Sequence, residues 1–102
     1  MDRIAMLSEV LSQDPNNVFA RYSLAMEYSN SGQLNQAIEE FEKLLAAHPD
    51  YAAGYFMAAQ TLVKSDQRDD AIKMLQQGIA AAQRKGDSHA QSEMQAMLDE
   101  MV

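Results

Sequence analysis

The histidines and carboxylates are the side chains of this sequence that could bind a metal or transfer protons. His48 precedes a turn proline and His89 lies in the opening turn of a helix, far from it in the chain. Neither is part of a His-Glu-x-x-His motif or a similar spacing, which would place two ligands on one helix face. We therefore expect both histidines to be solvated or to cap helices.

The acidic residues gather near the starts of predicted helices. Glu39, Glu40 and Glu42 follow a helix start near Leu34, where negative charge favours the positive end of the helix dipole. A carboxylate pair for acid–base catalysis would need a cleft, so we interpret these residues as helix-surface charge. The serines lack a partnered histidine in any local motif, and the four glycines are too dispersed for a phosphate loop. We predict no enzyme, no cofactor and no metal, and rank an enzyme using dispersed carboxylates last.

Composition limits the class of protein. The 102 residues, 47% of them hydrophobic, suffice for one domain. The net charge of −7 disfavours nucleic acid and anionic membranes as partners, and the absence of cysteine excludes thiol chemistry. The N-terminal stretch MDRIAMLSEV has no signal-peptide core, and no apolar run is long enough to span a membrane. These features predict a soluble, cytoplasmic protein.

Helix-forming residues dominate the chain, which predicts an all-α fold. Five short stretches of turn and capping residues interrupt them, at 14–17, 30–33, 48–50, 64–67 and 85–88. We expect six helices that pack antiparallel with their neighbours because the connections are short. The expected ranges are 2–13, 17–31, 34–47, 51–65, 68–84 and 88–101.

The sequence repeats itself every 34 residues. Shifting the chain by this period aligns apolar residues three times over, and also aligns Pro15 with Pro49 and Ala25 with Ala59. A single pair of amphipathic helices cannot bury its apolar faces alone, whereas stacked pairs make a continuous core. The period predicts a short solenoid. The three aligned sets are Ile4, Ile38 and Ile72; Leu7, Phe41 and Leu75; and Leu11, Leu45 and Ile79.

The spacing of the repeated residues resembles that of the tetratricopeptide repeat. The resemblance rests on Leu24, Ala25, Tyr28, Ala37, Phe41 and Pro49, and the second copy keeps Tyr55, Ala59, Leu62, Ala71 and Leu75. It implies a small bacterial-type repeat protein that forms a right-handed superhelix. As one domain, 1–102 would divide into a half repeat (1–17), two repeats (18–51 and 52–85) and a capping helix (86–102). The main departures are Arg21, where the family often has tryptophan, together with Ala58, Gly78 and Gln83.

The final helix has one apolar face, formed by Ala90, Met94, Met97, Leu98 and Met101. We interpret it as a cap over the open end of the stack, with Asp87 or Ser88 as its N-cap. The alternative is a detachable helix that competes for the binding groove.

The resemblance places the first helix of each pair on the concave face of the superhelix. Its inward positions carry aromatic and methionine side chains, which suit an apolar peptide or an amphipathic helix. Some members of the family bind the C-terminal carboxylate of a partner with polar and basic residues at these inward positions. The resemblance predicts no such carboxylate clamp here, because Tyr22, Met26 and Met57 occupy positions where it would need polar or basic residues. We predict a protein-interaction module, and the alternatives are homodimerisation through the same face or simple packing under the final helix. The predicted contact residues are Phe19, Tyr22, Met26, Phe56, Met57, Gln60, Val63 and Lys64.

Overall fold

The computed structural model describes residues 2–102 and contains six α-helices in that range, which confirms the predicted all-α solenoid. Residue 1, which the prediction assigned to the N-terminal half repeat, lies outside the described residues. Every helix begins and ends within one residue of its expected position. The helices are α1 (Arg3–Gln13), α2 (Val18–Asn30), α3 (Leu34–Ala47), α4 (Ala52–Lys64), α5 (Arg68–Lys85) and α6 (Ser88–Met101).

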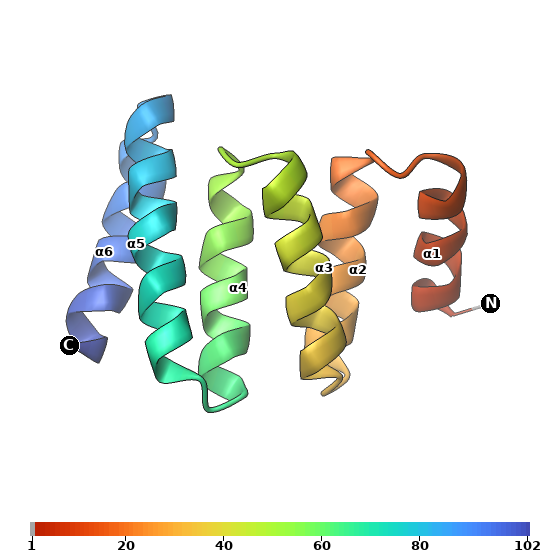
Figure 1. Cartoon of the computed structure of the whole chain (residues 1–102), viewed down its shortest axis with the longest axis horizontal. Coiled ribbons are helices and arrows are strands. Elements are labelled where there is room, and N and C mark those ends of the chain that lie inside the picture. The colour runs from red at the N-terminus through yellow and green to blue at the C-terminus, as the bar shows by residue number, and fades with distance from the viewer. Residues whose placement is uncertain (1) are drawn as a thin grey trace.

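Consecutive helices pack against one another to form a slab of 40 × 29 × 18 Å (Figure 1). In the view of Figure 1, α2 and α6 lie behind α3 and α5. Helix α4 also touches both α2 and α6, so the first helix of each pair meets its counterpart in the next pair. Within residues 2–102, none of the helices has the length and apolarity that a membrane crossing requires.

Short polar residues begin and end the helices. Asp2, Asn17 and Asp87 are N-caps, and the side chain of each accepts a hydrogen bond from a backbone N–H in the first turn. The α2–α3 and α4–α5 turns are closed by the same hydrogen bond, from Gln33 N to Tyr28 O and from Gln67 N to Leu62 O. Both turns need a residue in the left-handed region, so the two pairs share one connection geometry.

The core is a series of buried clusters that runs through the stack. Ala25 and Ala37 are fully buried where α2 meets α3, and Ala59 and Ala71 are fully buried where α4 meets α5. These positions are one period apart, so the same close contact recurs in both repeats. Large side chains fill the space beside them, and Phe41 and Leu75 are the equivalent fully buried residues of α3 and α5.

One acidic residue contradicts the expectation of surface charge. Glu39 and Glu42 are exposed, but the Glu40 side chain is only 11% exposed and its Oε1 lies 2.6 Å from Nη1 of Arg21. Arg21 Nη2 also donates to the carbonyl oxygen of Pro15. The prediction for Glu40 was wrong because the dipole argument considered α3 alone, whereas α2 brings a guanidinium to this position.

Candidate functional site

A groove of about 250 Å³ lies between the first helices of the successive pairs. Its residues come from α2, α4 and α6, with Asp87 at the start of α6. We call it the α4–α6 groove, because these two helices supply eight of its ten lining residues. It is lined by Tyr22, Ala52, Ala53, Phe56, Met57, Asp87, His89, Ala90, Glu93 and Met94.

The apolar floor follows from the helical period. Ala53, Phe56 and Met57 occur at i, i+3 and i+4 on α4, so they lie on one face of that helix. Phe56 packs against the C-terminal cluster, which contains Ala59 and Leu75. Met57 packs against the central cluster, which contains Ala25 and Phe41. Each side chain is therefore packed on one side and half-exposed on the other, which gives the groove an apolar floor.

Tyr22 closes the groove on the α2 side. Its ring meets Phe41 and Tyr51 edge to face, with centroid separations of 6.3 and 5.6 Å. Burial raises the pKa of the Tyr22 hydroxyl, and the nearby Tyr51 raises this pKa further. The residue is thus part of the packed core as well as of the groove wall.

Helix α6 forms the opposite wall and does not occupy the groove. Asp87 Oδ1 accepts a hydrogen bond from Ala90 N, which caps the start of the helix at the edge of the groove. Met94 is fully buried against α5, where a Cβ added to Gly78 would lie 2.5 Å from its sulfur atom. Glu93 accepts from His89 Nε2 at 3.2 Å along the rim if that nitrogen carries a proton.

A buried hydrogen bond between two hydroxyl groups joins α2 to α4. Ser29 Oγ and Thr61 Oγ1 are 3.1 Å apart and buried. Thr61 Oγ1 donates to the carbonyl oxygen of Met57, so the Ser29 hydroxyl donates to Thr61. This directed pair fixes the spacing of the two helices that carry the aromatic lining.

The predicted contact residues are only partly brought together. Tyr22, Phe56 and Met57 line the α4–α6 groove, and Met26 packs in the central cluster beside Tyr22. Val63 is 45% exposed and lines a second cavity of about 330 Å³ at the other end of the α4–α6 seam. Phe19, at 74% exposure, lines neither cavity. The same is true of the half-buried Gln60 and the exposed Lys64.

The second cavity is also walled by α6. Its lining residues are Val63, Asp66, Arg68, Met97, Glu100 and Met101. Met94 of the groove and Met97 and Met101 of this cavity follow one another on the apolar face of α6. The two hollows therefore lie along the same two helices, one at each end.

The residues that the sequence reasoning missed are those of the α6 wall. Asp87, His89, Ala90 and Glu93 line the groove. From the sequence, this helix is interpreted as a cap or as a competitor for the groove, and not as one of its walls. The available signal was the position of α6 as a first helix after two complete pairs, which places it next to α4. In the part of the chain that the structure describes, no three histidine or carboxylate side chains gather as metal ligands would.

Known proteins are similar to this chain in sequence and in fold. Tetratricopeptide repeat models match residues 30–98 and residues 6–39. A TPR repeat-containing protein of Pseudomonas aeruginosa is 26% identical over 92 residues, which cover 90% of this chain and 88% of that protein.

Solved structures show the same likeness. A tetratricopeptide repeat domain protein from Salinibacter ruber superposes with a TM-score of 0.81 and 33% identity, over 86% of this chain and 89% of that one. The TPR2B domain of yeast Sti1 has a TM-score of 0.88 over 96% of this chain and 78% of its own, but at 12% identity the likeness shows the fold alone. Since one family model spans well over half of the sequence, the chain belongs to the tetratricopeptide repeat family.

Proposed function

We propose that this protein is an interaction module that binds an apolar peptide or short helix of a partner protein in the α4–α6 groove. The observation that carries the proposal is the groove itself, with Tyr22, Phe56 and Met57 half-exposed on its walls. Interface anchors are usually a few aromatic or long apolar side chains of this kind.

The size of the groove favours a macromolecular partner over a small-molecule substrate. Ligand pockets for small molecules have volumes of about 300–1,000 Å³ and bury most of the ligand. At about 250 Å³, this groove has room for one or two side chains of a partner. The flexible thioether of Met57 can repack around apolar side chains of different shape.

The family supports the same class of function, because tetratricopeptide repeat proteins typically act as protein-interaction modules. The yeast Sti1 domain, which shares the fold, was solved as a complex with pHsp70. A protein or peptide partner for this chain is consistent with both facts. The identity of the groove residues as contacts is our proposal.

The proposal is tested by a substitution that fills the groove without disturbing the core. Ala53 is exposed on α4 and lines the groove, so Ala53→Gln adds bulk there and removes no buried group. The probe is a fluorescein-labelled neutral peptide of about 14 residues, with leucine at helical spacing and glutamine elsewhere. We expect Ala53→Gln to weaken binding of this peptide about tenfold or more at an unchanged melting temperature.

The matched control is Ala80→Gln, at an exposed alanine on α5 that lies outside the groove. It should change neither binding nor stability. Amide shifts in ¹H–¹⁵N spectra should concentrate at Phe56, Met57 and Ala90 when the peptide binds. Equal binding by the two variants, or shifts spread elsewhere, would contradict the proposal.

Homodimerisation through the same face is the competing function, and it predicts a different result. The exposed Phe19 on α2 is the feature that favours it. Light scattering at micromolar concentration would then give twice the monomer mass of 11.4 kDa, and Phe19→Ser would restore the monomer. A monomeric wild-type protein removes this alternative.

A further inference from the structure

Negative charge predominates among the residues that line the α4–α6 groove. The inference from this charge rests on the groove function proposed above. Asp87 and Glu93 line the rim, whereas no lysine or arginine does so among the described residues. His89, the remaining ionisable group on that rim, already lies 3.2 Å from a Glu93 oxygen. The groove therefore combines an apolar floor with an acidic edge.

The helix dipoles do not cancel this charge. Helices α4 and α6 both begin at the groove, and each N-terminus carries about half a positive charge, which together amount to about one. The two carboxylates carry about two negative charges, and Asp87 already binds a backbone N–H of α6. The groove edge keeps a net negative charge, in a chain whose total is −7.

We infer that the partner segment is a basic amphipathic one. An apolar side chain of the partner enters the groove between Phe56 and Met57, and a neighbouring lysine or arginine pairs with Glu93 and Asp87. This preference is the reverse of that expected for a groove that grips a carboxylate. It also disfavours a second copy of this chain as the occupant, because both copies would carry the charge of −7.

The test compares three peptides of one pattern. The neutral leucine–glutamine probe is compared with versions in which several glutamines are replaced by lysine or by glutamate. We expect the lysine peptide to bind at least about tenfold more tightly than the glutamate peptide, and its affinity to fall as salt is raised. The leucine-free lysine peptide should bind weakly, because charge alone does not fill the floor.

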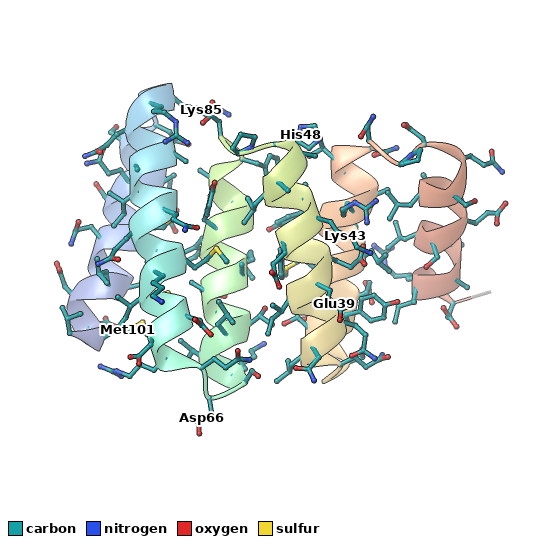
Figure 2. The ribbon with its side chains drawn as sticks, in the orientation of Figure 1. Glu39, Lys43, His48, Asp66, Lys85 and Met101 are labelled. Atoms are coloured by element: carbon teal, nitrogen blue, oxygen red, sulfur yellow. The ribbon has the colours of Figure 1, made fainter. Side chains whose placement is uncertain are left out.

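Removing the rim charge should remove the preference. In the double variant Glu93→Gln with Asp87→Asn, asparagine still caps α6, so the fold is kept. Its affinity for the lysine peptide should fall about fivefold or more, and the salt dependence should flatten. The control changes the net charge equally but on other helices: Glu39→Gln on α3, shown in Figure 2, with Asp69→Asn at the start of α5. This control should retain the preference for lysine.

The outcomes separate this inference from the function on which it depends. If the glutamate peptide binds as tightly as the lysine peptide and Ala53→Gln still blocks both, the groove is the site but its charge preference is refuted. If the control variant loses as much affinity as the rim variant, the attraction comes from the net charge and the inference fails. If no peptide of any charge responds to Ala53→Gln, the groove function itself is wrong.

Discussion

The α2–α3 and α4–α5 helix pairs share one backbone arrangement but carry different side chains at equivalent positions. In the α2–α3 pair, Arg21 forms an ion pair with Glu40, whereas the α4–α5 pair has Tyr55 and Met74 at the equivalent positions. Both Arg21 and Tyr55 nevertheless donate to the carbonyl oxygen of a proline six residues earlier, in the loop before the helix. In both pairs a long side chain with a donor at its tip makes this hydrogen bond, and either residue type can do so.

The contacts that lead from each pair to the next helix differ in a complementary way. Leu44 of α3 is buried in one cluster with Ala58, the seventh residue of α4. The equivalent residue of α5 is Gly78, and the seventh residue of α6 is Met94. Each junction combines a large residue with a small one, but the large residue belongs to α3 in the first junction and to α6 in the second. The space at each junction is filled in both cases, although the large side chain comes from a different helix.

The departures Arg21, Ala58 and Gly78 from the usual repeat pattern are therefore explained by their partners. A substitution that makes one repeat like the other should be harmful alone and less harmful with its partner. Of the following three predictions, ordered from the largest effect to the smallest, the first two test this coupling and the third compares the turns of the two pairs.

The largest effect is expected for Gly78→Leu, which gives the second repeat the residue of the first. Even a Cβ atom at this position would lie 2.6 Å from the Cβ of Tyr55, which cannot move without its backbone. We expect a loss of unfolding free energy of about 3 kcal/mol or more, measured by urea denaturation. Adding Met94→Ala should recover only the part due to the sulfur contact. A stable Gly78→Leu protein would mean that α5 packs less closely than described.

An intermediate effect is expected where the first repeat loses its ion pair. Glu40→Met leaves the guanidinium of Arg21, whose side chain is 17% exposed, without its carboxylate, at a cost of about 2 kcal/mol. The double variant Arg21→Tyr with Glu40→Met copies the second repeat and restores a donor for the Pro15 carbonyl. Its midpoint should therefore exceed that of Glu40→Met alone. If the two losses simply add, the pair and its replacement are not equivalent.

The smallest effect concerns the turns. Gly32 (φ 79°) and Asp66 (φ 60°) occupy the same place in the α2–α3 and α4–α5 turns, and Asp66 projects from the end of the slab in Figure 2. Glycine adopts this conformation without steric cost, so Asp66→Gly should stabilise the fold by about 0.5 to 1 kcal/mol. The reciprocal Gly32→Asp should lower the melting temperature. A destabilised Asp66→Gly would show that the aspartate makes a compensating contribution in its turn.

The sequence predicted the fold well because the relevant signals are local and repeated. Turn residues such as Asn17 and Gly86 mark helix ends by their own backbone and capping preferences, and Ala25 and Ala59 mark close crossings one period apart. The candidate site was predicted less completely. Phe19 shares a helical face with Tyr22 and Met26, but the periodicity of α2 does not reveal how far the neighbouring helices extend over that face.

The sequence by itself determined six amphipathic helices, their short connections and their period, because each depends on residues close together in the chain. Only the tertiary structure decided what lies across from each helix. Packing of α2 on α3 turned Glu40 from a surface charge into the buried partner of Arg21. Packing of α6 beside α4 gave the groove its second wall and its acidic rim at Asp87 and Glu93. Burial and pairing depend on which faces meet, and a helix sequence specifies its own faces but not the residues that its neighbours bring to them.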